Sequence, residues 1–290
     1  MASSPALASA TKTKSIECNA QECLMTDNRD RPRCRLRCVW YRIASTVIGL
    51  MVYLALTPGL SPAGPPYATD DPEPVDYKHW ELYLASQVAH DDGGWSGTAP
   101  HVEVNYGVLP NVQLHLIAPL VFDLPNQATG RYGYGDTEVG VKFRFISETD
   151  WRPMVGIFPI LELPSGDAKN GLGGGHVQTF LPLWLQKSVG AWTTYGGGGY
   201  WINPGAGNRD YWFVGWLVQR KIVEHVAAGA EIFHTTPKEV RGESETRFNV
   251  GLVVDFTDNQ HLLFSAGRGL QGSNDFQGYL AYQLTFGPRE

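Results

Sequence analysis

From residue 80 onward, the chain consists of short stretches in which apolar and polar side chains alternate. In residues 137–146, Val139, Val141 and Phe143 share one parity, and Glu138 and Lys142 share the other. A period of two predicts β-strands with one apolar and one polar face. Twelve such stretches can be delimited: 80–89, 101–108, 112–121, 136–146, 153–163, 178–187, 190–201, 211–221, 225–235, 246–256, 260–268 and 276–286. Because no stretch shows a convincing helical period, we predict an all-β chain.

The connections between these stretches alternate strictly between long and short. The long ones are 90–100, 122–135, 164–177, 202–210, 236–245 and 269–275, and the short ones are 109–111, 147–152, 188–189, 222–224 and 257–259. A soluble sandwich or lipocalin has no physical reason to place its long loops at every second connection. An outer-membrane barrel does, because tight turns face the periplasm and longer loops face outside. We therefore predict an antiparallel transmembrane β-barrel of about twelve strands, with both termini at the short-turn rim.

Composition agrees with a barrel and excludes other classes. The mean hydropathy of −0.21 is too low for a polytopic helical membrane protein. With 43% hydrophobic and 18% charged residues, the chain is not a disordered polyelectrolyte, and a net charge of −6 argues against nucleic-acid binding. A closed sheet pairs every backbone N–H and C=O, as hydrocarbon requires. Aromatic residues expected in girdles at the membrane interfaces are Trp80, Trp184, Trp192, Trp201, Trp212, Tyr200, Tyr211 and Tyr279.

The N-terminal region predicts export. Six arginines between residues 29 and 42 precede an apolar run at 43–56, which is short for a bilayer-spanning helix. A basic flank, a short apolar run and small residues after it are typical of a secretory signal, with cleavage expected after Ala63. A retained signal anchor is the alternative, and Met25 is an alternative start of translation.

Two further features belong to this N-terminal part. The four cysteines lie before residue 39 and are spaced C-x4-C and C-x3-C: Cys18, Cys23, Cys34 and Cys38. This spacing allows a zinc interpretation, but no histidine lies among them, and the plainer interpretation is a leader that the mature protein lacks. Residues 64–79 are rich in proline and acidic residues, which predicts an extended, exposed periplasmic tail. The expected domains are a leader at 1–63, the tail at 64–79 and the barrel at 80–290.

Three short motifs resemble those of a known bacterial family. Residues 133–143 (GYGDTEVGVKF) are similar to the G-x-GD-x-x-x-G-x-K-[FY] stretch of an outer-membrane transporter family named after the meta-pathway of phenol degradation. Residues 161–167 (LELPSGD) resemble its P-[ST]-G-D motif, and residues 106–114 (YGVLPNVQL) resemble its early hairpin. The resemblance covers residues 80–286. It implies an outer-membrane barrel that passes small organic solutes, hydrophobic or aromatic ones among them, with no catalytic residue and no cofactor.

The C-terminus departs from what is usual for such barrels. Many of them end on an aromatic residue that is recognised during assembly, whereas here Phe286 is followed by Gly287, Pro288, Arg289 and Glu290.

The residues themselves predict no catalytic, cofactor or metal site. Gly267, Gly269 and Gly272 form a G-x-G-x-x-G pattern, but an alternating strand follows, so we expect a hairpin loop and no dinucleotide site. His261 and Ser265 share a strand face at about 13 Å, too far apart for the hydrogen-bonded pair that a lipid hydrolase needs. The four glycines at 196–199 lie inside a strand, where they weaken pairing but permit a bend or the close approach of an inward plug; the functional alternative is a wider lumen.

Charged residues on the polar parity are the candidates for the lumen wall: Glu103, Glu138, Lys142, Arg144, Glu162, Glu231, Arg247 and Asp255. One interpretation is a mutually paired interior that plugs a narrow barrel, and the other is a polar pathway that selects solutes.

The functional hypothesis is passive passage of small organic solutes through a monomeric barrel in the outer membrane. A membrane-embedded lipid hydrolase and a structural or adhesive barrel are the alternatives. The expected partners are the outer-membrane bilayer, a small-molecule solute and the barrel-assembly machinery, with no nucleic acid.

Overall fold

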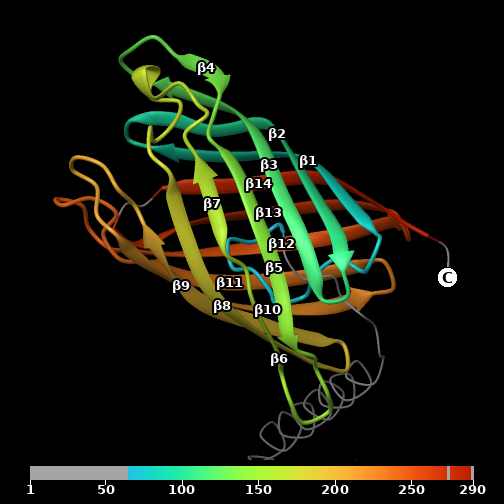
Figure 1. Cartoon of the computed structure of the whole chain (residues 1–290). Coiled ribbons are helices and arrows are strands. Elements are labelled where there is room, and N and C mark those ends of the chain that lie inside the picture. Colours follow the sequence, from blue (N-terminus) through green and yellow to red (C-terminus); the bar gives the residue numbers. More distant parts are fainter. Residues whose placement is uncertain (1–64, 273–274, 289–290) are drawn as a thin grey trace, which may run out of the picture. The chain divides into compact units, whose positions relative to one another are not determined.

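The computed structural model describes residues 65–272 and 275–288. The leader, its cysteines and the expected cleavage site lie outside the described residues. The described strands (Figure 1) are β1 (Trp80–Asp91), β2 (Gly94–Leu109), β3 (Val112–Pro125), β4 (Arg131–Tyr134), β5 (Thr137–Ile146), β6 (Met154–Ile157), β7 (Ile160–Leu163), β8 (Gln178–Val189), β9 (Trp192–Ile202), β10 (Tyr211–Val223), β11 (Val226–Thr235), β12 (Glu245–Thr257), β13 (Gln260–Gln271) and β14 (Phe276–Phe286). A short 3-10 helix, η2 (Ala168–Asn170), lies in the connection between β7 and β8.

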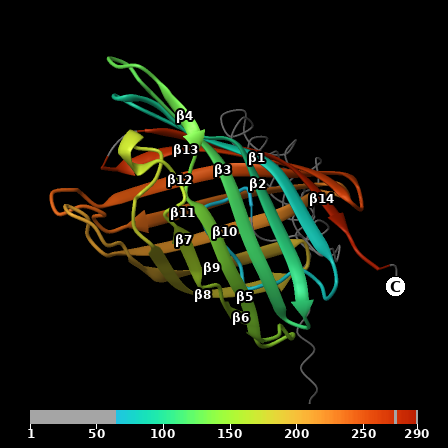
Figure 2. The same ribbon diagram turned by 45° about the horizontal axis from the view of Figure 1, so that its top comes forward.

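These strands form one antiparallel sheet that closes on itself. The last strand, β14, pairs with β1 from Trp80 opposite Phe286 to His90 opposite Phe276. Two strands away from this seam, β3 pairs with β5 (Figure 2). Two positions of the ring are each occupied by two successive strands, the short β4 followed by β5, and the short strands β6 and β7. The result is a closed antiparallel barrel with twelve strand positions, which confirms the predicted fold.

The strands extend further than the sequence pattern indicated at the long-loop rim. Residues 90–100 are not the predicted loop, because β1 and β2 continue to Asp91 and Gly94 and leave only residues 92–93 as a turn. The Asp91 carboxylate stabilises this turn by accepting the backbone N–H groups of Gly93 at 2.7 Å and Gly94 at 3.0 Å. The G-x-G-x-x-G pattern is likewise not a loop throughout, because Gly267 and Gly269 belong to β13.

The two faces of the wall follow the alternation in the sequence. On β5, Val141 and Phe143 are exposed on the outer face, whereas Lys142 between them is buried on the inner face. On β10, Trp212 and Trp216 are exposed in the same way. An apolar outer face and a polar inner face are what a barrel in a bilayer requires.

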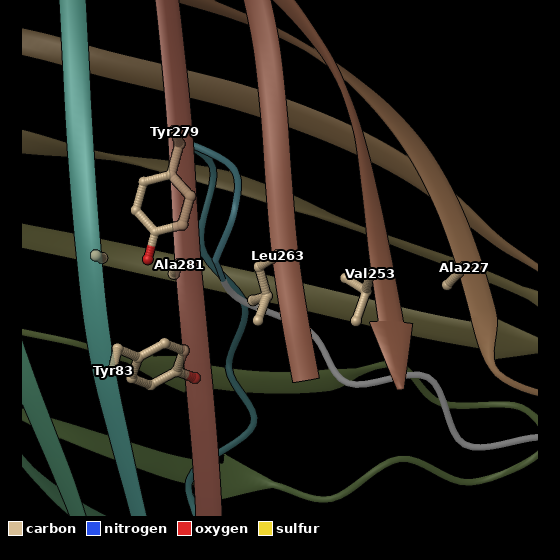
Figure 3. Close-up of a cluster of buried hydrophobic side chains, with 7 residues drawn as sticks. Tyr83, Ala227, Val253, Leu263, Tyr279 and Ala281 are labelled. Atoms are coloured by element: carbon tan, nitrogen blue, oxygen red, sulfur yellow. The ribbon is translucent and has the colours of Figure 1, made fainter. Parts of the chain in front are cut away.

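Two groups of apolar side chains cover parts of the inner face. One gathers around Tyr83 and Tyr279 on β1 and β14 and continues over β11 to β13 (Figure 3). The other is mainly aromatic and includes Phe180, Trp184 and Phe213. The predicted interfacial position of Trp184 and Tyr279 is therefore wrong: both are buried. The reason is parity, because they alternate in step with inward-facing glutamines on the same strands.

The glycines of β9 accommodate large neighbouring rings. A Cβ atom at Gly199 would lie 2.5 Å from Cε2 of Phe180, and one at Gly196 would lie 2.5 Å from Cε3 of Trp216. The groups that approach these two glycines closely are rings of the neighbouring strands β8 and β10, and not an inward plug.

Residues 65–79 do not form the exposed tail that their composition predicts. They run inside the barrel, as the blue trace in Figures 1 and 2 shows, and Thr69 and Asp71 are fully buried. The prediction of an exposed tail is wrong because the acidic and backbone groups of this segment find partners on the polar inner wall, which replace water. We call residues 65–79 the lumen segment.

Candidate functional site in the barrel lumen

The start of the lumen segment is held by the carboxylate of Glu231 on β11. Its two oxygens accept the backbone N–H groups of Ala68 at 2.9 Å and Thr69 at 2.8 Å. Asn249 donates to the same carboxylate at 2.5 Å, and Ser265 donates its hydroxyl to the carbonyl oxygen of Pro66 at 2.5 Å. Hydrogen bonds to a carboxylate are charge-assisted, so Glu231 is the strongest anchor at this end.

The middle of the segment is held through its acidic side chains. The Lys142 ammonium lies 2.9 Å from the Asp70 carboxylate and 3.7 Å from that of Asp71. The side chain of Glu73 accepts a hydrogen bond from Gln186 at 3.1 Å and lies 3.9 Å from the Arg144 guanidinium. Burial raises the pKa of the Asp71 carboxyl well above its usual value, and the Lys142 ammonium opposes that rise.

The end of the segment joins the barrel wall near the short-turn rim. Gln113 accepts the backbone N–H of Val75 at 2.8 Å. Beyond it, Lys78 donates its N–H to the carbonyl of Gly107 at 2.7 Å, and Gly107 donates to the carbonyl of His79 at 3.0 Å. The segment thus crosses the lumen from β11 to β2 and β3 before it turns into β1.

The eight predicted lumen residues fall into four places. Glu231, Lys142 and Arg144 contact the lumen segment directly. Glu103 and Glu138 flank the imidazole of His115, at 3.7 and 2.9 Å, and Glu162 lies opposite Glu138 in the register of β5 and β7. Nearer the long-loop rim, Arg247 pairs with Asp275 at 2.8 Å and with Glu245 at 3.3 Å. Near the short-turn rim, Asp255 pairs with His261 at 2.7 Å.

Sequence reasoning missed the uncharged partners in the lumen. Gln113, His115, Asn249 and Ser265 all lie on inward parities. Gln113, Asn249 and Ser265 contact the segment or its anchor Glu231, and His115 contacts Asn105 and Glu138. The signal that would have found them is the parity itself, because each of the four lies between two apolar residues of the outward parity on its strand.

Two cavities flank the lumen segment. One, of about 240 Å³, lies toward the long-loop rim beside Ala89 and Gly278. The other, of about 390 Å³, lies toward the short-turn rim beside Glu81 and Gln113. We call them the long-loop cavity and the short-turn cavity. Both are lined by the same four residues, Tyr67, Ala68, Gln87 and Tyr279, so they adjoin at this point.

Two hydroxyl groups at this junction have no hydrogen-bond partner. The phenol oxygens of Tyr67, on the lumen segment, and Tyr279, on β14, are both buried and unpaired among the residues described. A buried polar atom without a partner costs free energy unless something that enters the site binds it. Both hydroxyls thus lie at the junction of the two cavities with unused hydrogen-bonding capacity.

The described part of the lumen offers few groups for catalysis or metal binding. Ser265 is bonded to Pro66 and His261 to Asp255, so the two residues do not act as a nucleophile and its base. Within residues 65–272 and 275–288, no three His, Cys, Asp or Glu side chains gather as metal ligands. No helix in the same ranges is long and apolar enough to cross a membrane.

Comparison with known proteins identifies the class of fold. No protein-family profile and no curated protein matches the sequence. The structure is similar to that of an outer membrane channel from Pseudomonas putida F1, with a TM-score of 0.57 and 17% identity, over 78% of this chain and 100% of that one. It is also similar to the KdgM porin, with a TM-score of 0.50 and 11% identity, over 70% of this chain and 99% of that one. The fold is thus that of the outer-membrane β-barrels, which include channels and porins.

Proposed function

We propose that this protein is a passive channel that carries small organic solutes across the outer membrane. The observation that supports it best is the pair of adjoining cavities beside the lumen segment, inside a closed barrel with a polar inner wall. Solutes would enter at the long-loop rim, pass Tyr67 and Tyr279, and leave at the short-turn rim. The lumen segment narrows this route, which limits passage to small molecules.

The remaining sequence-based expectations support the same proposal. The arginine-rich leader would direct export, and the barrel-assembly machinery would insert the mature chain as a monomer. The motifs at residues 133–143 and 161–167 support membership of the transporter family named after the meta-pathway of phenol degradation. That family relation would favour hydrophobic or aromatic solutes. No feature of the described lumen favours a lipid hydrolase.

The test is solute flux through the purified protein in liposomes, followed by swelling, together with single-channel recording in planar bilayers. We expect swelling with small solutes, no swelling with large oligosaccharides, and a small conductance. Gln87→Trp, at the junction of the cavities, should reduce both signals. Leu84→Trp on the same strand is the matched control, because Leu84 is exposed on the outer face. Absence of flux and conductance in the unaltered protein would refute the channel and leave a structural or adhesive barrel.

A further inference from the structure

The short-turn cavity is unusually rich in acidic groups. Six carboxylates line it: Asp70, Glu73, Asp76, Glu81, Glu103 and Glu138. The basic groups in its lining are the ammonium of Lys142 and the imidazoles of His101 and His115.

The ion pairs around this cavity do not neutralise it. Lys142 is shared between Asp70 and Asp71, and His115 is shared between Glu103 and Glu138. Arg144 lies 3.9 Å from Glu73 and adds one further positive charge. The lining therefore has more acidic than basic groups even when both imidazoles are protonated. Buried carboxylates without a cationic partner either take up a proton or bind a cation.

A second observation points to a ligand in the same place. Tyr279 lines the cavity with only 9% of its surface exposed, and its hydroxyl has no partner among the described residues. Figure 3 shows its ring on the inner face beside that of Tyr83 on the neighbouring strand. A phenol oxygen with free lone pairs accepts a hydrogen bond from an ammonium group, and aromatic faces attract cations.

The protein already places one ammonium group in this cavity. The Lys142 Nζ atom lies 2.9 Å from the Asp70 carboxylate and 5.0 Å from the centre of the Phe158 ring. Phe158 lines the same cavity. A carboxylate on one side and an aromatic face on the other thus hold a primary ammonium, and the remaining carboxylates and Tyr279 offer the same groups to a second one.

We propose that the short-turn cavity binds small organic cations, namely ammonium groups on an aromatic or aliphatic body, and that it makes the channel prefer cations to anions. This proposal rests on the proposed channel function for its transport part, but binding of the cation is a property of the cavity alone. An organic anion of the same size would face the excess carboxylates and be repelled.

The experiment measures selectivity and binding separately, on the mature protein. Selectivity comes from the reversal potential in a tenfold KCl gradient, and binding comes from calorimetry in detergent with benzylammonium, benzyl alcohol and benzoate as probes. We expect potassium to permeate at least about threefold better than chloride, and benzylammonium alone to bind. Anion preference, absence of preference in a conducting channel, or equal binding of the three probes would overturn the proposal. Binding of benzylammonium to a barrel that does not conduct would refute the channel and keep the cation site.

Two variants test the named groups. Glu81→Gln combined with Glu103→Gln removes two charges but keeps a hydrogen-bonding oxygen at each position, and should lower the potassium preference at least twofold. Tyr279→Phe removes only the free hydroxyl and should weaken benzylammonium binding about two- to fivefold. Glu243→Gln, in an exposed loop, is the matched control and should change neither value. Unchanged selectivity and binding in both lumen variants, with folding verified by faster migration on unheated gels, would place the site elsewhere and contradict the assignment.

Discussion

At the residue scale, one carboxylate determines where the lumen segment lies. Glu231 is nearly fully buried and accepts two backbone N–H groups of that segment. A buried N–H that loses its acceptor costs about 1–3 kcal/mol, so the anchor depends on this single side chain more than on any one ion pair at the segment's middle.

Glu231→Ala should therefore release the start of the segment, weakening its attachment by about 2–4 kcal/mol. The measurement uses Thr69→Cys as a reporter and a membrane-impermeant maleimide as the label. The reporter alone should resist labelling because Thr69 is fully buried, and it should be labelled rapidly when combined with Glu231→Ala. Glu231→Gln keeps one acceptor oxygen and should give an intermediate rate. Equal protection in all three backgrounds would show that Glu231 does not anchor the segment.

Parity predicts the wall of the site but not its occupant. Lys142, Arg144 and Glu231 lie on the polar parity of their strands, which the sequence alone indicates because alternation along a strand is a local property. Their partners could not be predicted, because Ala68 and Glu231 are 163 positions apart in the sequence. A proline- and acid-rich segment has no periodicity of its own, so no local sequence pattern distinguishes a buried segment from a solvated tail.

At the scale of elements, the lumen segment and β9 show two ways of filling the interior. The segment adds chain to the lumen, whereas β9 removes side chains so that the rings of neighbouring strands pack against its backbone. The segment lowers the free cross-section of a barrel with twelve strand positions, whereas the glycines of β9 make room for rings of the neighbouring strands.

Deletion of residues 65–76 should widen the lumen while the strands of the barrel stay paired in a closed ring. We expect single-channel conductance to rise about threefold or more, because the segment and its ion pairs no longer occupy the route. Migration on unheated gels should stay that of the closed barrel. Residues 77–79 are kept since they bond to β2 around Gly107. A deletion that leaves the conductance unchanged would mean that ions do not pass beside the segment.

Gly199→Ala should destabilise the barrel by about 1–3 kcal/mol, since the new Cβ would lie 2.6 Å from the Cα of Pro182. Relief of this clash requires a shift of the paired strand's backbone, which costs free energy. Gly278→Ala is the matched control, because its Cβ would meet its nearest atoms only at 3.4 Å. The measurement is the midpoint of unfolding in urea, monitored by tryptophan fluorescence. Similar midpoints for the two variants would contradict the packing account of β9.

At the scale of the whole molecule, the fold depends on the seam between β1 and β14. Closure pairs backbone groups that hydrocarbon would otherwise leave unsatisfied. The twelve strand positions and their antiparallel order could be predicted from two patterns. The alternation of apolar and polar side chains and the alternation of long and short connections both follow from the position of the barrel in a bilayer. The loop at residues 90–100 could not, since a hairpin that rises above the membrane needs no apolar outer face and shows no distinct pattern.

Leu280→Pro tests the seam. Leu280 lies opposite Ser86 on β1 and Phe264 on β13, so a proline there removes a donor from a strand paired on both sides. The unheated protein should lose its faster-migrating form on a gel, and the loss of stability should reach about 3 kcal/mol or more. Leu280→Ala changes only an outward side chain and should keep that form. A closed, heat-modifiable Leu280→Pro barrel would show that the seam is not essential.

The lumen segment leads directly into β1 through His79, so a segment released from Glu231 would stay tethered to the barrel. Its rebinding would be intramolecular, with an effective concentration set by a few residues of chain and near the millimolar range. The fraction of barrels with a bound segment would therefore not depend on how many copies the membrane holds.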